Sequence, residues 1–136
     1  MKNLKGYIFS RKFYDERVPQ HIQNLVLRNY CTNNNLSFEL SSTEYSMENS
    51  FYVLNKLVNE KKYRGIIFYS LFQLPENNKK RLDILKKLIF KKKKLFFAIE
   101  DITINKMSDI KKIEDIWFIK KISKNCLLTH ELKNKI

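Results

Sequence analysis

Side chains able to move protons or bind anions follow three short apolar runs of the sequence. They are Ser10, Arg11, Arg17, Gln20, His21 and Asn24 after the first run, Glu44, Tyr45, Glu48 and Asn49 after the second, and Tyr69, Ser70 and Gln73 after the third. Imidazole and carboxylate groups suit general acid–base catalysis, and guanidinium groups bind phosphates or carboxylates. These residue types therefore indicate acid–base chemistry on a small anionic ligand.

A few of these residues can be assigned roles, although each also has a structural explanation. We expect Arg17 to hold the anion, Glu48 or Glu44 to act as the base, and His21 to act as the acid, because imidazole titrates near neutrality. A nucleophilic Ser10 would need one of these groups beside it. Equally, both glutamates would be favoured near a helix start, and the spacing of Arg17 and His21 fits a solvated helix face.

The sequence lacks the motifs that commonly bind metals and cofactors. It contains no glycine-rich phosphate loop and no HExxH pattern, and its two cysteines, Cys31 and Cys126, lie far apart. We therefore expect no metal, no cofactor and no disulfide framework.

Four apolar runs alternate with segments of helical period. They predict strands at 6–10, 36–40, 65–69 and 95–99, with helices over 17–33 and from residues 46, 75 and 108. Such alternation implies right-handed crossovers and a mainly parallel sheet covered on both faces. We predict a three-layer α/β/α domain over residues 1–123, with four strands in the order 2-1-3-4, and a C-terminal tail over 124–136. This order places Ser10 and Ser70 at one end of adjacent strands, where α/β sheets bind ligands.

The helical segments also predict which side chains face the sheet. The apolar face of the first helix is formed by Val18, Ile22, Leu25, Val26 and Tyr30. Ser46 is a candidate cap for the second helix, with Met47 on its inner face. The last helix carries Trp117, Phe118 and Ile119 in succession. A helix buried on one side does not need all three, so we expect one to face a partner in a homodimer or higher oligomer.

The formal net charge of +13 is concentrated in the second half of the chain. Residues 1–60 hold seven basic and six acidic side chains, whereas residues 61–136 hold twenty and eight. Lysines outnumber arginines by 22 to 5, and lysine lacks the planar fork that binds phosphates and bases bidentately. We therefore expect solvated helix faces, including a solvated turn at residues 91–94, and do not expect nucleic acid as the partner.

Targeting signals and membrane spans are not expected. The first six residues are too polar for a signal peptide, and no apolar run reaches the roughly 18 residues that span a bilayer. A cytoplasmic location follows as the expectation.

A strand ending in serine and a later strand running into residues 70–75 resemble the catalytic domain of serine recombinases, the resolvase fold. Ser10 falls where that family keeps its nucleophile. The family motif Leu-Asp-Arg-Leu-Gly-Arg corresponds to residues 71–76, which read Leu-Phe-Gln-Leu-Pro-Glu. The aspartate and both arginines are replaced, and phosphoryl transfer needs cationic stabilisation. We therefore expect a resolvase- or flavodoxin-like fold without recombinase activity.

Residues 6–11, 17–25, 43–49 and 69–75 resemble the small sporadic carbohydrate cluster proteins of bacterial surface-polysaccharide gene clusters. That resemblance implies polysaccharide or lipopolysaccharide biosynthesis on a sugar phosphate or sugar nucleotide. Isomerisation, epimerisation or hydrolysis would fit the acid–base side chains. The alternative is a non-catalytic resolvase-like module that binds nucleic acid or a protein. An enzyme should place its ligand contacts in the near-neutral first half of the chain.

Overall fold

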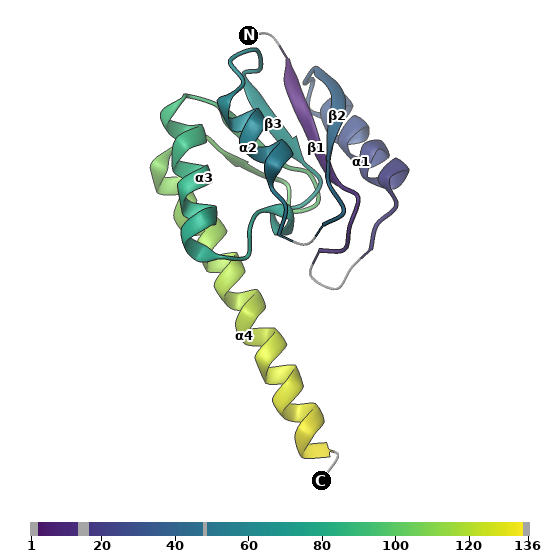
Figure 1. Cartoon of the computed structure of the whole chain (residues 1–136), viewed down its shortest axis with the longest axis vertical. Coiled ribbons are helices and arrows are strands. Elements are labelled where there is room, and N and C mark those ends of the chain that lie inside the picture. Colours follow the sequence, from purple (N-terminus) through teal and green to yellow (C-terminus); the bar gives the residue numbers. More distant parts are fainter. Residues whose placement is uncertain (1–2, 14–16, 48, 135–136) are drawn as a thin grey trace.

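Strands and helices alternate along most of the chain (Figure 1). The computed structural model describes residues 3–13, 17–47 and 49–134, with side chains as far as residue 123. Its strands are β1 (Leu4–Phe9), β2 (Phe38–Glu44), β3 (Gly65–Phe68), β4 (Lys94–Phe97) and β5 (Ile102–Ile104). Its helices are α1 (Gln20–Asn33), α2 (Tyr52–Asn59), α3 (Asn78–Phe90) and α4 (Ile110–Asn134), and 3₁₀ turns span Leu71–Gln73 and Met107–Asp109.

The sheet has the order β2-β1-β3-β4-β5. The predicted order and parallel pairing of its first four strands are confirmed. The antiparallel strand β5 was not predicted. It follows a tight turn in which Asp101 has a φ of 53°, and its three residues are too few to show a strand period.

Alternate residues of the strands pack against different helical layers, as predicted for a three-layer domain. Leu4 and Ile8 of β1 belong to a core cluster that contains Leu27 and Cys31 of α1. The opposite face of the sheet forms a larger cluster with apolar side chains of α2, α3 and α4. Figure 1 shows α1 on one side of the sheet and α2 and α3 on the other.

The predicted inner face of α1 is wrong by one position. The residues that face the sheet are Gln23, Leu27 and Cys31, whereas Leu25 is 50% exposed. The reason is polar, because the buried Gln23 amide binds the backbone of Phe9, a contact that an apolar-periodicity argument overlooks. Burial raises the pKa of the Cys31 thiol from 9.0 to about 11.

The start of α2 also differs from the prediction. The helix begins at Tyr52, Met47 is exposed, and Ser46 lies outside the helix. The backbone N–H groups of Val53 and Leu54 donate instead to the carboxylate of Glu44, at 3.0 and 3.1 Å. A side chain from the preceding strand thus takes the place of a local cap.

The turn at residues 91–94 is not uniformly solvated, contrary to expectation. Lys93 is 4% exposed, and its ammonium donates to the carbonyl oxygens of Leu57 and Glu60 at the C-terminus of α2. Lys91 donates to the Val58 carbonyl at 3.1 Å. Burial, with the neighbouring Lys91, lowers the pKa of Lys93. These lysines therefore satisfy the last carbonyls of α2.

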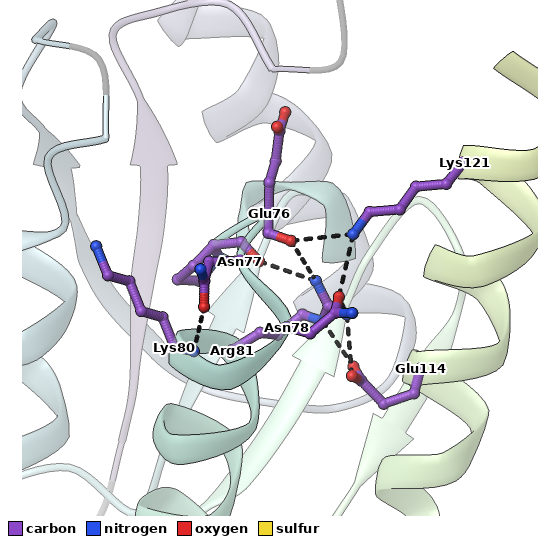
Figure 2. Close-up of polar contacts among 8 residues, drawn as sticks. Glu76, Asn77, Asn78, Lys80, Arg81, Glu114 and Lys121 are labelled. Carbon is purple, nitrogen blue, oxygen red and sulfur yellow. Dashed lines mark hydrogen bonds and ion pairs between the residues drawn. The ribbon is translucent and has the colours of Figure 1, made fainter. Parts of the chain in front are cut away.

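A buried arginine joins α3 to α4 (Figure 2). Arg81 pairs with Glu114 through Nε–Oε2 and Nη2–Oε1 contacts of 2.6 and 2.9 Å, and its guanidinium lies 4.5 Å from the Trp117 ring. Its Nη1 donates to the carbonyls of Pro75 and Glu76. From this junction α4 continues as far as Asn134, and the predicted domain boundary at residue 123 stays a prediction.

Candidate functional site

The two serines that follow β1 and β3 lie at the same end of adjacent parallel strands. The pairing of Leu4 with Gly65 and of Tyr7 with Phe68 establishes this arrangement, as predicted. The loops after these strands therefore meet at the carboxyl edge of the sheet, where the topology reverses direction.

Four of the predicted site residues line one cavity at this edge. The cavity has a volume of about 360 Å³ and is lined by Phe9, Ser10, Arg11, Arg17, Val18, Pro19 and Gln20. We call it the Arg17 cavity. Its described lining holds two guanidinium groups and no carboxylate, and it adjoins the first turn of α1, which contains no acidic residue. These features favour an anionic ligand.

Arg11 is held rigidly between the loops after β1 and β2. Its Nη1 donates to the carbonyls of Tyr45 and Met47, at 2.7 and 3.1 Å. Its guanidinium carbon lies 4.3 Å from the Phe9 ring centroid and 5.0 Å from that of Phe51. These contacts use only part of the guanidinium's five donors, so the group can position a ligand at little entropic cost.

The Ser10 hydroxyl donates to a backbone acceptor. Its Oγ lies 2.6 Å from the carbonyl oxygen of Glu44. Within the described part of the chain, this proton is therefore not held by the imidazole or carboxylate that a nucleophilic serine requires.

The carboxylate of Glu44 is 1% exposed and lies inside the fold. Besides the two helix N–H groups, it accepts from the Tyr7 hydroxyl at 2.7 Å and from the Tyr45 N–H at 3.3 Å. Burial is the larger cause, and the adjacent Glu44 carboxylate the next, of a Tyr7 pKa that is raised well above 10. These contacts account for Glu44 structurally, and its role as a base stays a prediction.

The other predicted residues that the structure describes are not part of the lining of the Arg17 cavity. Glu48 lies outside the described residues. Asn49 is exposed with a φ of 60°, and Tyr45 lines a separate cavity of about 380 Å³ beside β2 and α2. His21 is exposed on the first turn of α1, and Asn24 is half-buried one turn further along. The predicted convergence of all these groups on one ligand stays a prediction.

Two buried glutamines, Gln23 and Gln73, stabilise the carboxyl edge of the sheet through hydrogen bonds. Gln73 donates to the Gln23 side chain at 2.8 Å and accepts from the Tyr69 N–H at 3.2 Å. Gln23 in turn binds the carbonyls of Phe9 and Val18. Sequence reasoning missed Gln23, although it stands four residues before Leu27 on the buried face.

A second cavity at the same edge contains a carboxylate that sequence reasoning also missed. It has a volume of about 150 Å³ and is lined by Phe13, Tyr69, Ser70, Phe72, Ile99, Glu100 and Lys120. We call it the Glu100 cavity. The Ser70 hydroxyl donates to Glu100 Oε2 at 2.7 Å, and the Leu71 N–H donates to Oε1 at 2.9 Å. The available signal was the position of Glu100 directly after the fourth apolar run.

The described residues contain no group of three or more His, Cys, Asp or Glu side chains placed to hold a metal ion. None of their helices combines the length and apolarity needed to cross a membrane.

Comparisons with known proteins give a fold and no family. No family model and no curated protein matches the chain, so the resemblance to sporadic carbohydrate cluster proteins receives no support. A resolvase family site-specific recombinase from Streptococcus pneumoniae is similar in structure, with a TM-score of 0.62, 11% identity and 98% of each chain covered. The N-terminal catalytic domain of TP901-1 integrase has a TM-score of 0.60 and 14% identity, over 90% of this chain and 98% of the other. The chain thus has a resolvase-like fold.

Proposed function

We propose that the chain binds a small phosphate-bearing sugar in the Arg17 cavity and acts in carbohydrate biosynthesis. The observation that carries the proposal is that Ser10, Arg11, Arg17 and Gln20 line one cavity at the switch edge of the sheet. Its volume of about 360 Å³ is in the range of small-molecule sites. The sugar part of the proposal rests on the resemblance described from the sequence.

The phosphate part of the proposal rests on charge. Arg17 lines the cavity and is exposed, Arg11 is fixed by its backbone contacts, and α1 begins beside them without a capping side chain. A phosphate would therefore meet two guanidinium groups and the positive end of a helix dipole.

The proposed chemistry is proton transfer without a metal. His21 follows Gln20, which lines the cavity, on the first turn of α1 and is exposed, and its imidazole is assigned the role of the acid. His21→Ala should leave the melting temperature unchanged while abolishing turnover of the phosphate-bearing sugar. Glu48→Ala should have the same two effects. Normal turnover by both variants would remove these two residues from the mechanism.

The binding proposal is tested by calorimetry with inorganic phosphate, hexose 1-phosphates and nucleotide sugars. Arg17→Ala should weaken the binding of each phosphate compound about tenfold or more, the loss expected for a charge-assisted hydrogen bond. Arg28→Ala removes another exposed arginine, which lies on α1 and outside the lining of the cavity, and should leave affinity unchanged. Equal affinities for the two variants would refute the Arg17 cavity as the binding site.

A second proposal, self-association, rests on a different observation. Trp117 is buried at the junction with α3, whereas Phe118 and Ile119 are 64% and 61% exposed. In Figure 1 the C-terminal half of α4 extends away from the sheet. In proteins, helices gain most of their stability from packing rather than from intrinsic propensity. Packing against a second copy of the chain would therefore stabilise the extended half of α4. Light scattering should give twice the monomer mass, and Phe118→Ser with Ile119→Ser should halve it. A monomeric parent protein would refute the proposal.

A further inference from the structure

The Glu100 cavity combines aromatic rings with opposite charges. Phe13, Tyr69 and Phe72 supply rings, Glu100 supplies a carboxylate, and Lys120 enters from α4 with its ammonium 5.3 Å from the Phe72 ring centroid. The volume of about 150 Å³ is below the roughly 300 Å³ of a complete small-molecule site, so it suits a fragment of about one ring.

The carboxylate of Glu100 is oriented, and its contacts with the described residues do not use all of its capacity to accept hydrogen bonds. Oε2 accepts from Ser70 and Oε1 accepts from the Leu71 N–H, which fixes the plane of the group. A carboxylate has about four lone-pair sites, so each oxygen can accept one further hydrogen bond. The Ser70 hydroxyl also accepts from the Phe72 N–H at 3.2 Å, and it is therefore held in place as a support.

The charges of the cavity select against ionic fragments. A cation bound at Glu100 would lie near the Lys120 ammonium, and an anion bound at Lys120 would lie near the carboxylate. A neutral group that both donates and accepts hydrogen bonds meets neither repulsion. Hydroxyl groups do both, and the faces of aromatic rings accommodate the apolar face of a ring that carries them.

We propose that the Glu100 cavity binds the neutral hydroxylated ring of a sugar whose phosphate occupies the Arg17 cavity. This inference rests on the proposed function and adds the ring site to it. The two cavities are close. The ring centroid of Phe13, which lines the Glu100 cavity, lies 5.8 Å from that of Phe9, which lines the Arg17 cavity. The Phe13 centroid also lies 5.9 Å from that of Tyr69, a second residue of the Glu100 cavity. Glu100 accepts from one ring hydroxyl and Lys120 donates to another.

The test compares inorganic phosphate with a panel of glucose, galactose and mannose 1-phosphates by calorimetry. The parent protein should bind the best sugar phosphate of the panel about tenfold more tightly than inorganic phosphate. Glu100→Gln and Lys120→Met should each remove most of that preference, because one charge-assisted hydrogen bond is worth about tenfold. Their affinity for inorganic phosphate should not change.

Lys120→Met covers the case in which Glu100→Gln fails to fold, because it leaves the contacts among Ser70, Leu71 and Glu100 intact. The matched controls are Lys111→Met, an exposed lysine on the same helix, and Glu76→Gln, whose side chain points away from the contacts in Figure 2. The controls should keep the preference for the sugar phosphate.

The outcomes separate the two proposals. If no phosphate compound binds the parent protein, the proposed function fails and the ring site fails with it. If phosphate binds through Arg17 but the sugar phosphates bind no better, or bind equally well to the Glu100 and Lys120 variants, the ring site alone is refuted.

Discussion

Replacing Glu114 by alanine should destabilise the domain strongly while leaving its surface almost unchanged. Arg81 has a side chain that is 2% exposed, and Glu114 is the carboxylate that neutralises it through two hydrogen bonds (Figure 2). The change would leave the guanidinium buried without that counter-charge, although its bonds to the carbonyls of Pro75 and Glu76 remain. Removing one member of a buried pair is costly because the other cannot regain its hydration.

The size of the effect can be worked from the exposure of the two partners. Breaking a buried pair costs about 3–5 kcal/mol. The Glu114 side chain is 25% exposed, so water can enter the vacated space, and we expect the lower end of that range, about 3 kcal/mol. For a domain of this size the change corresponds to a fall in melting temperature of roughly 10 °C.

Urea unfolding monitored by the fluorescence of Trp117 is the appropriate assay, because the ring lies 4.5 Å from Arg81 in the same junction. The matched control is Lys112→Ala, which breaks the pair with Asp109 at 3.9 Å, where the lysine side chain is 69% exposed. An exposed pair of this kind is worth under about 1 kcal/mol. If Glu114→Ala costs no more than the control, the junction does not stabilise the fold in the way described.

Three further predictions concern the interior. Tyr7→Phe should reduce the loss of stability that occurs above about pH 10. The folded-state pKa of Tyr7 is raised, so its contribution to the free energy of unfolding is complete below the unfolded-state pKa and is lost as pH rises. Urea titrations from pH 7 to 11 would measure the difference. Gly65→Ala should lower the melting temperature far more than Gly6→Ala, because its Cβ would lie 2.2 Å from the Lys94 backbone carbonyl, whereas the nearest atom at Gly6 belongs to a side chain; equal losses would contradict this. Gln23→Leu should cost about 2–3 kcal/mol in urea unfolding by leaving buried polar groups without partners, and a neutral effect would refute its supporting role.

The strands were predictable because their apolar runs are local and nearly continuous. Residues 65–68 and 94–97 form strands where runs of apolar side chains predicted them, and alternation with helices was enough to fix a parallel order. The buried face of α1 and the start of α2 were less predictable, because Gln23 and Glu44 override the local pattern through contacts with distant backbone.

The candidate site was predictable only in part. Position after a strand predicted that Ser10, Arg17 and Gln20 reach one edge of the sheet, and the structure places all three in the lining of the Arg17 cavity. It could not show that the carboxylate of Glu44 turns inward, since the same position in sequence is compatible with either direction of the side chain. Applied to the fourth apolar run, the same reasoning would have included Glu100.

The approximate positions of the first four strands, their parallel pairing and the separation of basic charge into the second half were readable from the sequence, because they follow from periodicity and composition along the chain. Which of the polar groups are buried partners of the backbone, and which line a cavity, was settled by the packing of the folded chain. The physical reason is that a buried polar group must find a hydrogen-bond partner. For Gln23, Glu44, Arg81 and Lys93 that partner comes from a segment distant in sequence, and no local pattern records it.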